Sequence, residues 1–67
     1  MTHRYLNTAG QLAIISFSEH NGNFTIFRTL PAEDTEVKSF ETLAGLLAYH
    51  HELHWDLEDK GFQLRRY

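Results

Sequence analysis

The dipeptide Asn21-Gly22 separates two apolar, β-branched runs, and it constrains the fold more than any other feature of the sequence. The run before it is "QLAIISFS", residues 11–18, and the run after it is "NFTIFRTL", residues 23–30. Asn and Gly both tolerate the positive φ angles that a two-residue type I′ turn requires. The sequence therefore predicts an antiparallel β-hairpin around this turn.

A proline and a second apolar pattern follow the hairpin. Pro31 cannot donate a hydrogen bond to a neighbouring strand, so it ends the second strand. After the loop "PAEDTE", the segment "TEVKSF", residues 35–40, is predicted as a short third strand. Ser39 suits the N-cap of a helix, and Glu41 suits the positive end of a helix. In "FETLAGLLAYHHE", five residues share one helical face: Phe40, Leu43, Leu46, Leu47 and His50.

This helix has two possible ends. If it runs to Lys60, His50 and His54 fall in the middle of its apolar stripe, and burying imidazoles without partners is costly. Glu52 and Asp56 would also repel each other one turn apart. We therefore predict that the helix stops near residue 52 and that an irregular loop follows.

Gly61 has a role in both versions. It leads the irregular loop into a last strand, "FQLRRY", residues 62–67, or it caps the longer helix. Either way the order of elements is β-β-(β)-α-β. This order predicts an α+β fold, in which the hairpin extends to a three- or four-stranded sheet with one amphipathic helix on one face.

Size and composition favour one small domain, residues 1–67. A chain of this length buries only about 60% of the surface that its unfolded form exposes. There is no cysteine, so neither a disulfide nor a thiolate metal site can stabilise it. No apolar run approaches the roughly 18 residues of a membrane span, and no hydrophobic signal region follows the N-terminus. We expect a soluble cytoplasmic protein with no membrane partner.

Charge and motifs argue against two classes of function. The net charge of −3 disfavours nucleic-acid binding, because phosphate contacts need clustered Lys and Arg. There is no G-x-S-x-G turn and no glycine-rich phosphate loop, and a concave active site is hard to build in so small a domain. We expect a protein that is not an enzyme and uses no cofactor.

The stretch "AYHHELHW", residues 48–55, holds three of the five histidines. The zinc-protease motif H-E-x-x-H is not met, because the second histidine of His51-Glu52-Leu53-His54 comes one residue too early. His50 and His54 do have the i, i+4 spacing that can chelate a metal, with Glu58 as the local third candidate. Solvated histidines at a helix end are the competing interpretation.

The C-terminal half resembles the last helix and last strand of Src-homology-2 domains. The family's helix carries a Phe-x-Ser/Thr-Leu-x-x-Leu-Val-x-Tyr/His-Tyr/His pattern, and the following strand ends in an L-x-Y-like pattern. The hairpin is similar to the family's central strands, so the resemblance covers roughly residues 4–67. The family's first helix and the N-terminal part of its sheet are absent. The matching residues are Phe40, Thr42, Leu43, Leu46, Leu47, Tyr49, His50 and Leu64.

The resemblance implies a phosphotyrosine-peptide site. Arg4 would take the place of the family's buried strand arginine, which holds phosphate by bidentate hydrogen bonds. Asn7 and Thr8 would stand in the phosphate-binding loop, and Asn23 where the family usually has histidine. Trp55 would anchor a bound peptide. A solvated Arg4 and a Trp55 packed on the core are the structural alternatives.

We therefore predict a non-catalytic module that binds a protein or peptide, and two alternatives stay open. Size, acidity and element order also resemble HicB-type antitoxins and small phage-encoded inhibitors. Such an inhibitor would use an exposed edge strand or an acidic face formed by Glu33, Asp34, Glu36 and Glu41. Metal binding by His50 and His54 is the second alternative.

Overall fold

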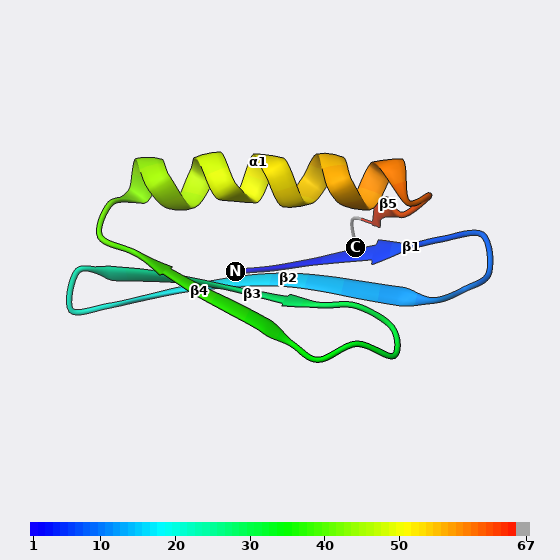
Figure 1. Cartoon of the computed structure of the whole chain (residues 1–67), viewed down its shortest axis with the longest axis horizontal. Coiled ribbons are helices and arrows are strands. Elements are labelled where there is room, and N and C mark those ends of the chain that lie inside the picture. Colours follow the sequence, from blue (N-terminus) through cyan, green and yellow to red (C-terminus); the bar gives the residue numbers. More distant parts are fainter. Residues whose placement is uncertain (66–67) are drawn as a thin grey trace.

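A computed structural model describes residues 1–65, which form an antiparallel sheet of five strands with one helix across one face (Figure 1). This confirms the predicted α+β class and adds a strand to the predicted sheet. The sheet order is β4-β3-β2-β1-β5. None of the helices in residues 1–65 is long and apolar enough to cross a membrane. The elements are β1 (Thr2–Leu6), β2 (Leu12–His20), β3 (Asn23–Thr29), β4 (Glu36–Phe40), α1 (Leu43–Asp59) and β5 (Gln63–Arg65).

The predicted hairpin is confirmed as β2 and β3. His20 pairs with Asn23, so Asn21 and Gly22 form a two-residue turn with φ angles of 52° and 79°. Both values are positive, as the type I′ turn requires. The Glu19 side chain accepts a hydrogen bond of 3.0 Å from the Gly22 N–H, which holds the turn.

The sheet extends beyond the hairpin on both sides. β4 confirms the predicted third strand, and β5 confirms the start of the predicted last strand; Arg66 and Tyr67 lie outside the described residues. β1 is the strand that the sequence did not predict. It pairs with β2 from Thr2↔Ser16 to Leu6↔Leu12 and with β5 through Tyr5↔Leu64. β1 therefore lies inside the sheet, between two neighbours.

The start of α1 differs from the prediction. Ser39 belongs to β4, and the N-cap is Thr42, whose hydroxyl accepts a hydrogen bond of 3.1 Å from the Gly45 N–H. Ser39 pairs with Thr25 and the strand continues to Phe40, so the residues after Ser39 are not helical and it cannot serve as the cap. Thr42 is the first residue beyond β4 that can satisfy a free N–H group of the helix.

The end of α1 is also different, because the helix runs to Asp59 rather than to residue 52. It closes in a Schellman motif: the Phe62 N–H donates to the Leu57 carbonyl, and the Gly61 N–H donates to the Glu58 carbonyl. Gly61 has a φ of 91°, which the motif requires. The longer of the two versions is therefore correct, with Gly61 as its cap.

The core lies between α1 and the sheet. The helix buries Leu46, Leu53 and Leu57, whereas Leu43 and Leu47 are 51% and 47% exposed. The face of α1 that packs on the sheet therefore differs from the predicted face. The prediction used only the first half of the helix, so it missed Leu53 and Leu57. The remaining buried residues are Tyr5, Ala13, Ile15, Ile26, Leu30 and Phe62.

Candidate functional site

The two faces of the sheet carry different side chains, because residues alternate along each strand. The deeply buried strand residues Tyr5, Ala13, Ile15 and Ile26 belong to the core under α1, so their strand neighbours point to the other side. We call that side the open face, because no described helix covers it (Figure 1). Its strand residues are Thr2, Arg4, Leu6, Leu12, Ile14, Ser16, Ser18, His20, Asn23, Thr25, Phe27, Thr29, Val37, Ser39, Gln63 and Arg65.

An apolar band crosses the open face diagonally and consists of Leu6, Leu12, Ile14, Phe27 and Val37. Leu6 lies opposite Leu12, and Phe27 lies opposite Val37. Ile14 is the diagonal neighbour of Phe27 across β2 and β3. Val37 is 55% exposed and Leu12 42% exposed. An uncovered face of an antiparallel sheet is commonly polar, so a contiguous apolar band is a candidate contact surface.

The rest of the open face is polar and carries no carboxylate side chain in the described part of the chain. Hydroxyl groups surround the band, among them Thr25 and Ser39, which are 3.3 Å apart. Arg4 and Arg65 lie directly opposite each other on β1 and β5. The nine Asp and Glu residues lie in α1, in loops or on the helix-facing side of strands. The lysines and arginines that the described strands place on this face are thus Arg4 and Arg65 alone.

Histidines gather on the opposite side of the sheet, between β1 and α1. The His50 ring lies 5.4 Å from the His3 ring and 4.9 Å from the Phe17 ring, measured between centroids. Burial lowers the pKa of His50, and the neighbouring His3, His54 and His51 lower this pKa further. This environment favours the neutral imidazole of His50, whose Nε2 atom is buried and has no hydrogen-bond partner among the described residues.

His54 lies in a short chain of polar contacts. Its Nε2 is 3.1 Å from Glu58, and its Nδ1 forms a hydrogen bond of 2.9 Å with the Tyr5 hydroxyl. A carboxylate only accepts hydrogen bonds, so in the neutral ring Nε2 carries the proton and Nδ1 accepts from Tyr5. These two contacts give His54 the partners that the sequence analysis had lacked, so its cost no longer argues against a helix continuing past residue 52.

The Glu58-His54-Tyr5 chain has the carboxylate, imidazole and hydroxyl order of a catalytic triad, but it lacks an accessible nucleophile. Tyr5 is fully buried. Burial, with a smaller contribution from Glu58, raises the pKa of its hydroxyl, which is the opposite of activation. Within residues 1–65, no group of three or more His, Cys, Asp or Glu side chains is arranged to hold a metal ion. This arrangement therefore stabilises the fold.

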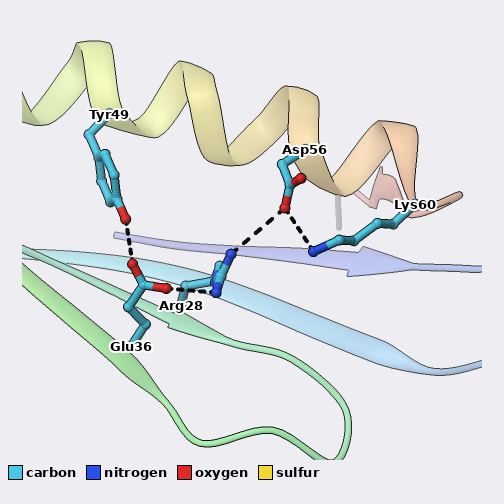
Figure 2. Close-up of polar contacts among 5 residues, drawn as sticks. All are labelled: Arg28, Glu36, Tyr49, Asp56 and Lys60. Carbon is cyan, nitrogen blue, oxygen red and sulfur yellow. Dashed lines mark hydrogen bonds and ion pairs between the residues drawn. The ribbon is translucent and has the colours of Figure 1, made fainter.

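A second polar network joins the strands to the other flank of α1 (Figure 2). Arg28 of β3 contacts Glu36 at 2.6 Å and Asp56 at 3.7 Å, and Asp56 contacts Lys60 at 2.9 Å. The Tyr49 hydroxyl donates to Glu36, and this hydrogen bond is the main reason why the Tyr49 pKa is raised. Arg28 is the strand arginine that most resembles a buried anion site, but carboxylates of the same chain already neutralise it. The sequence analysis missed this network because its members are far apart in the chain.

A shallow apolar hollow of about 230 Å³ lies where the start of α1 meets the β2–β3 end of the sheet. Leu43 and Leu46 form its helix side, and Phe17 and Phe24 form its sheet side. The only charged residue in its lining, Glu19, is bonded to the Gly22 N–H. The hollow explains why Leu43 is half exposed, and it adds a small apolar surface on the helix side.

The residues predicted for a phosphotyrosine site do not converge on one pocket. Arg4 lies opposite Ile14, and Asn23 lies opposite His20. Positions 14 and 20 are six residues apart on β2, which is about 20 Å along a strand. Arg4 and Asn23 thus share the open face, but a single phosphate group cannot contact both.

Asn7 and Thr8 lie in the β1–β2 turn, at the opposite end of the sheet from the β2–β3 turn (Figure 1). The Asn7 side-chain carbonyl accepts hydrogen bonds from the N–H groups of Ala9 and Gln11, at 3.1 and 2.9 Å. Its amide donates to the Gln11 side chain at 2.8 Å. These three bonds commit the Asn7 side chain to the turn, while Thr8 is exposed.

Trp55 lies on the outer surface of α1 and is 60% exposed. Its ring packs edge-on against His54, with 5.5 Å between ring centroids. Of the two expectations for this indole, exposure is therefore the one observed. Trp55 and the open face belong to different layers of the molecule, so they cannot form one contact surface.

Comparison with known proteins adds no relative. No family model matches the chain, and neither a curated protein nor a solved structure matches it. The Src-homology-2 resemblance stays a prediction from the sequence, and function is inferred from the chain's own surfaces.

Proposed function

We propose that this protein is a non-catalytic module that binds another protein or a peptide through the open face of its sheet. One observation carries the proposal: five apolar side chains form a contiguous band on a face that no described element covers. Exposed apolar patches rimmed by polar residues mark interaction sites. The fully buried Tyr5 supports the non-catalytic part of the proposal, because the only triad-like arrangement described has no accessible nucleophile.

Site-specific photo-crosslinking tests this proposal. A photoreactive phenylalanine analogue replaces Val37 on the open face in one variant and Ala48 on the outer surface of α1 in the control, because both positions are exposed. In cells that make the protein, we expect a discrete crosslinked product from position 37 and none from position 48. An excess of unmodified chain should abolish the product. Products from position 48 alone would show that the open face is not the binding surface.

A phosphotyrosine-peptide reader is a narrower form of this proposal. The place of Arg4 on the open face supports it, because a guanidinium there could hold a phosphate. The test is an NMR titration with tyrosine peptides, with and without phosphate. Phosphate-dependent shifts around Arg4 would support this form, and identical responses to both peptides would reject it.

An inhibitor or antitoxin-type role is another form of the same proposal. It requires a partner protein and no response to phosphate. The acidic face predicted for an inhibitor includes Glu36, but the Glu36 carboxylate already accepts hydrogen bonds from Arg28 and Tyr49. The open face is therefore the better candidate surface for this role too.

A further inference from the structure

We infer that two copies of the chain pair through the outer edge of β4, as antiparallel strands centred on Val37. The sheet order leaves β4 as an outer strand, with β3 on one side and no described strand on the other. An outer strand carries unpaired N–H and C=O groups with which another strand can pair. This surface is an edge of the sheet rather than the open face, and it is independent of the proposed function.

The hydrogen bonds of β2 establish which backbone groups face each neighbouring strand. The Phe17 N–H donates to the Met1 carbonyl at 2.9 Å, and the Phe17 carbonyl accepts from the Met1 amino group at 3.2 Å. The backbone of Phe17 therefore faces β1. Successive residues direct their backbone groups to opposite sides of a strand, so Ser16 faces β3, where it lies opposite Phe27.

The same alternation continues to the outer edge. Phe27 faces β2, so its neighbour Ile26 faces β4, where it lies opposite Lys38. Lys38 therefore faces β3, and Val37 and Ser39 direct their N–H and C=O groups outward. The registers of β2 with β3 and of β3 with β4 are continuous, so no bulge alters this assignment.

The segment "TEVKS", residues 35–39, is complementary to an antiparallel copy of itself. Thr35 extends the register of β4, since its hydroxyl lies 3.1 Å from that of Thr29 on β3. A partner strand centred on Val37 gives hydroxyl, acid–base and apolar pairs: Thr35 with Ser39, Glu36 with Lys38, and Val37 with Val37 of the partner copy.

The Glu36–Lys38 pairs favour this register through charge. They lie between the hydrogen-bonded pairs, where side chains on opposite strands are closest, and opposite charges there are favourable. Lys38 contacts the rings of Phe40 and Tyr49 but forms no ion pair in residues 1–65. Glu36 is 42% exposed, and a carboxylate can accept from a further donor besides Arg28 and Tyr49.

Other registers fit less well. The outward-facing residues must lie opposite each other, so the strands can shift only by two residues at a time. A shift in one direction places Glu36 opposite Glu36 of the partner copy, and a shift in the other places Lys38 opposite Lys38. Like charges directly across two strands are destabilising. The segment therefore selects a two-fold symmetric dimer in which both helices lie on one side of a continuous sheet.

Sedimentation equilibrium of the full chain, from about 10 µM to about 1 mM, tests the dimer. One pair of short strands is a small interface, so we expect a dissociation constant on the order of 100 µM. Ser39→Pro removes an outward N–H group, which an edge strand tolerates, and should weaken the dimer about tenfold or more. Ser39→Ala is the matched control because it keeps this N–H group and should leave the constant unchanged. Amide spectra establish that all variants fold.

A charge exchange tests the acid–base pairs. Lys38→Glu and Glu36→Lys should each weaken self-association about tenfold, and an equimolar mixture should restore it, because each variant supplies the charge that the other lacks. Glu52→Lys makes the same change of charge on the exposed surface of α1. It should bind the Lys38→Glu chain no better than the wild-type chain does.

A single introduced cysteine tests the register, because the chain has none of its own. The Cα atoms of a hydrogen-bonded pair are about 5.5 Å apart, which a disulfide can span. Val37→Cys should therefore oxidise to a covalent dimer faster than Lys38→Cys, whose counterpart lies opposite Glu36 instead. Equal rates would overturn the register.

Two results would overturn the β4 dimer itself. One is a chain that stays monomeric up to about 1 mM. The other is a dimer that survives Ser39→Pro but is lost in Leu12→Asp, which would show two open faces packed together. Neither result removes a different protein as partner of the open face. In the photo-crosslinking experiment, a dimer from position 37 has twice the mass of the chain, so it is distinguished from the product with such a partner.

Discussion

The two faces of the sheet differ in what packs against them. On the helix-covered face, Arg28 contacts Glu36 and Asp56, and Lys38 lies 4.5 Å from the centre of the Tyr49 ring. The open face instead carries an apolar band, Leu6, Leu12, Ile14, Phe27 and Val37, that no described element covers. The residues of the covered face thus have their partners in α1, whereas the band on the open face has none among the described elements.

The largest contrast between the faces should appear in stability. Leu57→Ala removes a fully buried side chain of the core and should lower the free energy of unfolding by about 3 kcal/mol. Phe27→Ala removes a larger side chain from the open face and should cost about 1 kcal/mol or less, because that ring is only partly buried. Urea denaturation measures both. Equal losses would mean that the open face contributes to the core.

The second prediction compares an arginine on each face of the sheet, Arg28 and Arg65, by its effect on stability. Arg28→Gln breaks the contacts with Glu36 and Asp56 and should destabilise the protein by about 1–2 kcal/mol, since the side chain is only 20% exposed. Arg65→Gln on the open face should change stability by less than about 0.5 kcal/mol. Thermal unfolding of the two variants at low salt provides the measurement. A loss from Arg65→Gln as large as that from Arg28→Gln would show that Arg65 also makes contacts that stabilise the fold.

Removing the N-cap of α1 should change the free energy of unfolding by a smaller amount. Thr42→Ala removes the N-cap hydroxyl and should cost about 1 kcal/mol. Ser39→Ala is the matched control, because Ser39 was the cap expected from sequence and instead lies in β4. Its loss should be a few tenths of a kcal/mol. If Ser39→Ala were the more damaging change, the helix would begin earlier than Leu43.

The histidine cluster under α1 should make stability depend weakly on pH. The pKa of His50 is lowered in the folded state, so the unfolded chain binds more protons around its ordinary pKa of about 6.5. Stability should therefore be full above about pH 6.5 and should fall as the pH drops below that value. Denaturation at neutral and mildly acidic pH measures the effect.

His50→Leu should flatten this pH dependence, whereas His20→Gln, at the exposed end of β2 and away from α1, is the control for the loss of a histidine. The groups that face His50 are His3 from β1 and His51 and His54 from α1. A pH dependence that survives His50→Leu would assign it to another group.

Local features of the fold were predictable from sequence, and features that depend on distant partners were not. The hairpin was predicted because Asn21 and Gly22 specify its turn without help from the rest of the chain. β1, with the sequence "THRYL", shows little apolar alternation and is a strand because β2 and β5 pair with it on both sides. The helix was predicted too short because the contact of His54 with Tyr5 joins residues 49 positions apart.

The candidate site had a signal in the sequence that was not used. In "QLAIISFS" two isoleucines are adjacent, and Phe27 follows Ile26, so apolar residues must point to both faces of these strands. One helix can cover only one of those faces. Which side chains share the open face within residues 1–65, in contrast, depends on the strand register, which no short stretch of sequence specifies.

The strand order also has a consequence for motion. Three of the four strand pairings join neighbours in the sequence, and only β1–β5 joins the two ends of the chain. β5 is three residues long and pairs on one side only, so we expect its amides to exchange with solvent sooner than those of β2. Arg65 belongs to this strand. The β5 edge should therefore be the most dynamic part of the open face, and a partner bound across that edge should slow amide exchange there more than anywhere else in the sheet.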